Sequence, residues 1–87
     1  MTSDGGEGER IADLRGFRCP LPVLKTRVRL RAMAPGERIV VLTDDPLAGI
    51  DIPCFCRQNG QPILEQAPHG DDADAIRFVI ERREGKL

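Results

Sequence analysis

The sequence predicts a two-layer α/β sandwich, in which two helices cover one face of a four-stranded mixed sheet. Its 87 residues suffice for one domain, and a composition of 40% hydrophobic and 31% charged residues is that of an ordinary globular protein. Apolar residues follow strand-like and helix-like spacings in the order β-α-β-α-β-β. Proline or glycine separates these segments, which places turns between them.

Six elements are expected within residues 10–87, after a small, acidic segment at 1–9 that is expected to be a disordered tail. The elements are expected at 10–14, 20–33, 37–43, 51–59, 61–66 and 74–82. The first strand, first helix and second strand should form a right-handed parallel crossover. The last two strands should pair as an antiparallel hairpin, joined by a loop at 67–73.

Prolines set the expected bounds of the helices. Pro35 stops the first helix, because proline cannot continue it. Before the second helix, the segment Asp44-Asp45-Pro46 offers an N-cap followed by a proline at the first helical position. Pro53 cannot lie deep in a continuous helix, so we expect one turn after Pro46 and a restart at Asp51.

The first helix carries two apolar stripes, only one of which can face a single sheet. One stripe contains Val23, Thr26, Leu30 and Met33. The other contains Leu21, Leu24, Val28 and Ala32. Periodicity alone does not show which stripe faces the sheet. The other stripe is then a partly exposed apolar patch that could contact a partner.

Composition disfavours several functional classes. The longest apolar run, Ile39–Leu42, is too short to span a membrane, and the N-terminal residues lack the basic and apolar regions of a secretory signal, so we expect a cytoplasmic protein. The chain has three cysteines and one histidine, and their spacing fits neither a disulfide framework nor a metal site. No phosphate-loop or catalytic-triad pattern is present, and we expect no metal and no cofactor.

Cys19 stands at the expected start of the first helix and is followed by two prolines, in the segment Arg15-Gly16-Phe17-Arg18-Cys19-Pro20-Leu21-Pro22. With Cys19 as the N-cap, the prolines supply no N–H group, so the N–H of Leu21 is expected to donate to the sulfur. The helix dipole and the two arginines are then expected to lower the pKa of Cys19. This favours the thiolate, which is the nucleophile in sulfur exchange.

Basic residues cluster around this cysteine. Residues 10–38 hold eight Lys or Arg against two acids, although the net charge of the chain is −1. Such a run indicates either a solvated helix face or a surface that attracts an acidic partner.

The second helix carries the other two thiols, Cys54 and Cys56, about 200° apart around its axis. Cys56 shares an apolar face with Ile52 and Phe55, so it is expected to be buried and inert. Cys54 is expected to be more exposed and could serve as a resolving thiol. His69 is expected to be a solvated loop residue.

Residues 13–22, DLRGFRCPLP, resemble the D-x-x-G-x-x-C-P-x-P signature of the TusA/SirA family of sulfur-carrier proteins. The segments PGE at 35–37, DDP at 44–46 and DIPCFC at 51–56 also resemble that family, and the likeness covers about residues 10–82. The resemblance implies a β-α-β-α-β-β sandwich like the C-terminal domain of bacterial translation initiation factor three. It also selects the stripe of Val23, Thr26, Leu30 and Met33 as the one facing the sheet.

The resemblance implies that Cys19 accepts sulfane sulfur as a persulfide from a cysteine desulfurase or a rhodanese-type donor. The sulfur then passes to an acceptor protein, in tRNA thiolation, molybdenum cofactor synthesis or sulfur metabolism, so the chain would act as a sulfurtransferase within a relay. The residues expected to orient or activate the thiol are Arg15, Gly16, Arg18, Pro20, Leu21 and Pro22. The chain departs from the family pattern at Cys54, where a small or variable residue is expected.

Two alternatives come from other functional classes. An RNA-binding module is suggested by the fold and the basic segment, but the chain has no Trp or Tyr on which bases could stack. A thiol-redox regulator is suggested by the cysteines, but no C-x-x-C is present. We therefore expect a monomer that binds protein partners and contacts neither nucleic acid nor membrane.

Overall fold

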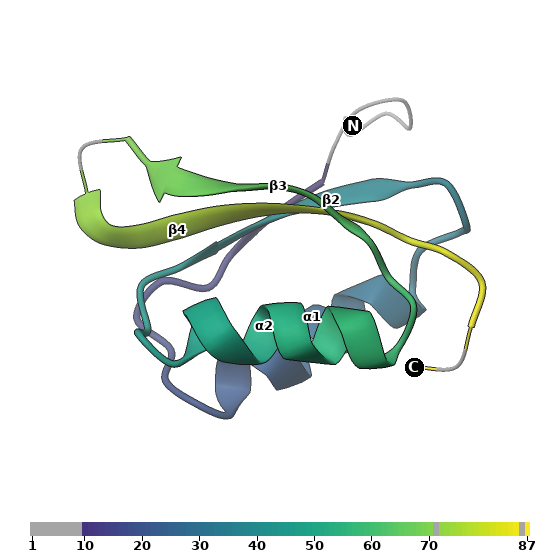
Figure 1. The fold of residues 1–87 in the computed structure, drawn as a ribbon, viewed down its shortest axis with the longest axis horizontal. Coiled ribbons are helices and arrows are strands. Elements are labelled where there is room, and N and C mark those ends of the chain that lie inside the picture. Colours follow the sequence, from purple (N-terminus) through teal and green to yellow (C-terminus); the bar gives the residue numbers. More distant parts are fainter. Residues whose placement is uncertain (1–9, 71, 86) are drawn as a thin grey trace.

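The structure, a computed structural model, describes residues 10–70, 72–85 and 87, and it confirms the predicted element order (Figure 1). The elements are β1 (Arg10–Asp13), α1 (Leu21–Arg31), β2 (Arg38–Thr43), α2 (Ala48–Gln58), β3 (Ile63–His69) and β4 (Asp72–Glu81). The tail expected at 1–9 lies outside the described residues.

The four strands form one mixed sheet in the order β1-β2-β4-β3. β1 pairs parallel with β2, and β4 pairs antiparallel with both β2 and β3. The expected parallel pairing of the first two strands and the expected antiparallel pairing of the last two are therefore confirmed. Because β1 and β2 run in the same direction, their carboxyl ends lie at the same edge of the sheet.

The main core lies between the sheet and the two helices, which cover the same face (Figure 1). The largest side chains buried there are Phe78, Leu30, Ile39, Ile52, Ile80 and Val41. Thr26 and Leu30 of α1, and Met33 just after it, are buried, while Leu21, Leu24 and Val28 are exposed. The stripe selected by the family resemblance is thus the one that faces the sheet.

Helix α2 is continuous, and the expected restart at Asp51 is wrong. The helix runs from Ala48 to Gln58 with Pro53 inside it. Proline removes one intrahelical hydrogen bond. Continuity places Ala48, Ile52 and Cys56, four residues apart, on one buried face. Burial of that face against the sheet outweighs the lost bond.

The loop expected at 67–73 is largely strand. β3 continues to His69 and β4 begins at Asp72, with register irregularities near Ile63 and Pro68. The prediction of His69 as a loop residue is therefore also wrong. Once β4 is paired with β2, the end of β3 can form cross-strand hydrogen bonds with β4, although its polar sequence does not predict a strand. Pro68 is tolerated there because β3 is an edge strand.

Candidate functional site

Cys19 lies in the turn between β1 and α1, where it is exposed. The helix begins at Leu21, so Pro20 and not Cys19 occupies the cap position, and the Cys19–Pro20 peptide bond is cis. The N–H of Leu21 donates to the carbonyl oxygen of Arg18 at 2.8 Å. The expected hydrogen bond from Leu21 to the sulfur is therefore wrong, because that donor is used to close the turn.

Two consecutive carboxylates that follow β2 hold this turn in place. Asp45 is buried, and its Oδ2 accepts the N–H of Cys19 at 2.7 Å. Its Oδ1 accepts the N–H of Leu47 at 3.3 Å, which joins the cysteine turn to the start of α2. Asp44 Oδ1 accepts the N–H of Gly16 at 2.9 Å. Gly16 has φ +93°, a conformation that favours glycine, and this directs its N–H at the carboxylate.

Both arginines expected to activate the thiol are paired with carboxylates. Arg15 Nη2 lies 2.7 Å from Asp13 Oδ2, and these hydrogen bonds lower the pKa of Asp13 to about 2. Arg18 Nη1 lies 2.9 Å from Asp44 Oδ1. Each of these two positive charges is therefore paired with an acid at the turn.

A carboxylate contacts the sulfur of Cys19. Cys19 Sγ lies 3.4 Å from Asp51 Oδ2, which belongs to the first turn of α2. The hydrogen bond to Asp51 raises the pKa of Cys19, and desolvation of the thiol and the negative charges of Asp51 and Asp45 act in the same direction. The expectation of a lowered pKa is wrong for the free protein, because it considered only neighbours in sequence.

The two thiols of α2 occupy different environments. Cys56 is 1% exposed, and burial raises its pKa to about 12, so its predicted place in the core is confirmed. Cys54 is half-buried and more accessible than Cys56, as predicted. It lines a shallow pocket of about 280 Å³ with Pro20 and Asp51, next to the Cys19 turn. All three cysteines are free.

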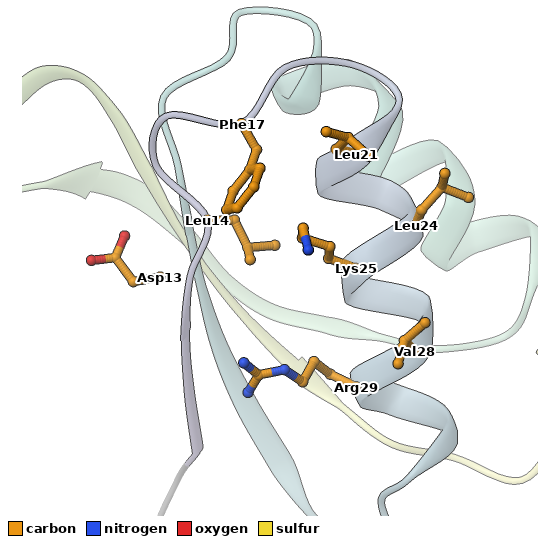
Figure 2. A pocket seen from close by; sticks show the side chains of 8 residues that line it. All are labelled: Asp13, Leu14, Phe17, Leu21, Leu24, Lys25, Val28 and Arg29. Carbon is orange, nitrogen blue, oxygen red and sulfur yellow. The ribbon is translucent and has the colours of Figure 1, made fainter.

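A second hollow of about 500 Å³ lies between the turn after β1 and the outer face of α1 (Figure 2). Leu21, Leu24 and Val28, from the exposed stripe of α1, form one wall. Lys25 Nζ lies 4.6 Å from the ring centroid of Phe17, and Figure 2 shows the two side chains facing one another. We call this hollow the α1 groove. Its surface is largely apolar, with the positive charge of Lys25 beside it, and its residues lie close to Cys19 in the sequence.

These features define a small α/β sandwich protein that presents one thiol at its surface, on a turn fastened by acids from a neighbouring connection. A comparison with family models matches residues 10–82 to the family described as sulfurtransferase TusA. The chain belongs to the TusA family. Membership supports a general sulfur-carrier or sulfurtransferase role and interaction with sulfur donor and acceptor proteins.

Outside residues 1–9, 71 and 86, no group of three or more His, Cys, Asp or Glu is placed to hold a metal ion. No helix in the described part of the chain is long and apolar enough to cross a membrane.

Asp44, Asp45 and Asp51 are the site residues that sequence reasoning missed. It assigned Asp44-Asp45 to a helix cap and Asp51 to a helix start, and it gave none of the three a contact with the thiol. One signal could have found Asp44 and Asp45, though not Asp51, which lies within α2. Parallel pairing of the first two strands places the segment after each strand at the same edge of the sheet, and those segments contain Cys19 and Asp44-Asp45.

Proposed function

We propose that Cys19 carries sulfane sulfur as a persulfide between a donor protein and an acceptor protein. The observation that carries the proposal is that Cys19 is the one exposed thiol of the three, on a surface turn within the matched family range. An exposed sulfur can be reached by large partners, whereas Cys56 in the core cannot.

The transfer consists of two thiol exchanges. The Cys19 thiolate attacks the terminal sulfur of a persulfide on the donor, which is a cysteine desulfurase or a rhodanese-type protein. A new S–S bond forms, the donor's S–S bond breaks, and the donor cysteine leaves as a thiolate. The acceptor's thiolate then attacks the terminal sulfur on Cys19, and Cys19 leaves as a thiolate. The acceptor would serve tRNA thiolation, molybdenum cofactor synthesis or sulfur metabolism.

The neighbouring residues act by orientation. Gly16 and Arg18 fasten the turn through Asp44, and Arg15 does so through Asp13. Pro20 and Pro22 restrict the backbone that follows the thiol. The α1 groove lies beside this turn, and its apolar wall and Lys25 suit a partner that brings apolar and acidic side chains together.

Intact-protein mass tests this proposal. The protein is incubated with a cysteine desulfurase, cysteine and pyridoxal phosphate. We expect an addition of one sulfur, about 32 Da, that reductant removes. The addition should be absent from Cys19→Ser and present in Cys54→Ser and Cys56→Ser. Sulfur uptake by Cys19→Ser would refute the assignment.

A further inference from the structure

The carboxylate of Asp51 has no evident place in the two exchange steps. It accepts a hydrogen bond from the Cys19 thiol at 3.4 Å, and it projects from a different element, α2. A carboxylate in this position stabilises the neutral thiol and opposes the thiolate that must attack the donor. The arrangement therefore works against nucleophilic attack in the free protein.

Other charged groups around the turn do not cancel this effect. They are Asp45 from the connection after β2, Asp44 from the same connection, and Arg15 and Arg18 from the turn itself. Asp45 accepts the N–H of Cys19, so it adds a second negative charge close to the sulfur. Arg15 and Arg18 are engaged by Asp13 and Asp44. Asp51 is thus the group that contacts the sulfur directly, and it is supported by Asp45.

We propose that Asp51 is a positioning residue that holds Cys19 as a neutral, hydrogen-bonded thiol and so suppresses its reactivity while the protein is free. The thiolate then forms when a partner breaks this hydrogen bond or places a cation beside the carboxylate. The suppression itself does not depend on the proposed sulfur carriage. The partner-dependent release rests on that proposed function.

Suppression suits an exposed carrier cysteine. A surface thiolate is open to oxidation and to reaction with small electrophiles, and these reactions follow thiolate character and access. Access cannot be reduced without excluding the partner proteins. Control of the proton is the remaining means of protection, and a hydrogen bond at the surface can be reversed by a partner that docks over it.

The test measures alkylation of Cys19 by iodoacetamide between pH 6 and pH 10, with peptide mapping to assign the label. Asp51→Asn should react about three- to tenfold faster than wild type at pH 7.5, with its midpoint moved to lower pH, because each unit of pKa changes the thiolate fraction tenfold. Asp51→Glu should restore slow reaction. Glu65→Gln, which removes a carboxylate of β3 that is paired with Arg77 of β4, should behave as wild type. An unchanged or slower rate in Asp51→Asn would overturn the proposal.

Label on Cys56 reports whether each variant is folded, because that thiol is buried in the native protein. Should Asp51→Asn expose Cys56, the wild-type protein alone decides. The measured quantity is the ratio of the alkylation rate with anionic iodoacetate to the rate with neutral iodoacetamide. This ratio should be lower for Cys19 than for free cysteine, because the carboxylates near Cys19 repel the anion. An equal ratio would overturn the proposal. Neither measurement uses a sulfur donor, so its outcome is independent of the mass experiment on sulfur loading.

Discussion

The turn that carries Cys19 and the face of α2 that carries Cys56 both raise the pKa of a thiol, but they do so by different means. At Cys19 the main cause is a hydrogen bond to Asp51, made at the surface. At Cys56 the cause is burial in the core. A partner can remove the first cause by contact, whereas only unfolding removes the second. The raised pKa therefore marks an inert thiol at Cys56, whereas at Cys19 we propose that a partner reverses it.

The largest effect is expected when the turn is released from its buried anchor. Asp45→Ala removes the acceptor of the Cys19 and Leu47 N–H groups and should lower the free energy of unfolding by about 2–3 kcal/mol, as for hydrogen bonds to a charged group. Urea denaturation measures this change. Asp13→Ala, which removes an exposed ion pair of the same turn, is the control and should cost much less, because exposed ion pairs contribute little. Equal costs would mean that Asp45 does not anchor the turn.

A smaller effect is expected in the core. Cys56→Ser places a hydroxyl on a buried face and should cost about 1–3 kcal/mol of unfolding free energy, while sulfur loading on Cys19 stays intact. Thermal or urea unfolding gives the cost, and intact mass gives the loading. Cys54→Ser is the matched control on the same helix, with a smaller cost because Cys54 is half-buried. A variant that melts like wild type but carries no sulfur would reverse the roles assigned to the two thiols.

The smallest effect is a dependence on alkaline pH. Because the pKa of Cys56 is about 12 in the folded protein and lower when unfolded, its contribution is fully present below the unfolded pKa and is lost as pH rises toward 12. Between pH 8 and pH 10 this should remove about 1–2 kcal/mol. Cys56→Val has no thiol to ionise and should lose correspondingly less stability over the same interval. Parallel losses in both proteins would show that other groups cause the alkaline decline.

The spacing of apolar residues along the chain predicted which helix faces are buried. The buried stripe through Thr26 and Leu30 and the burial of Cys56 follow from helical periodicity together with the family resemblance. The failures came from contacts distant in sequence. Asp45 and Asp51 meet Cys19 across 26 and 32 residues, and no local rule anticipates a carboxylate there. Pro53 inside α2 is a failure of the same kind, because packing on the sheet overrode a local preference.

The long sequence separation between Cys19 and its carboxylates has a consequence for modularity. A peptide that contained only the Cys-Pro-Leu-Pro turn and α1 would carry the thiol without Asp45 and Asp51. Grafting that segment onto another scaffold would therefore transplant a cysteine but not its chemical behaviour, which is supplied by the connection after β2 and by α2. The residues that make up this site therefore extend along the chain from β1 to α2.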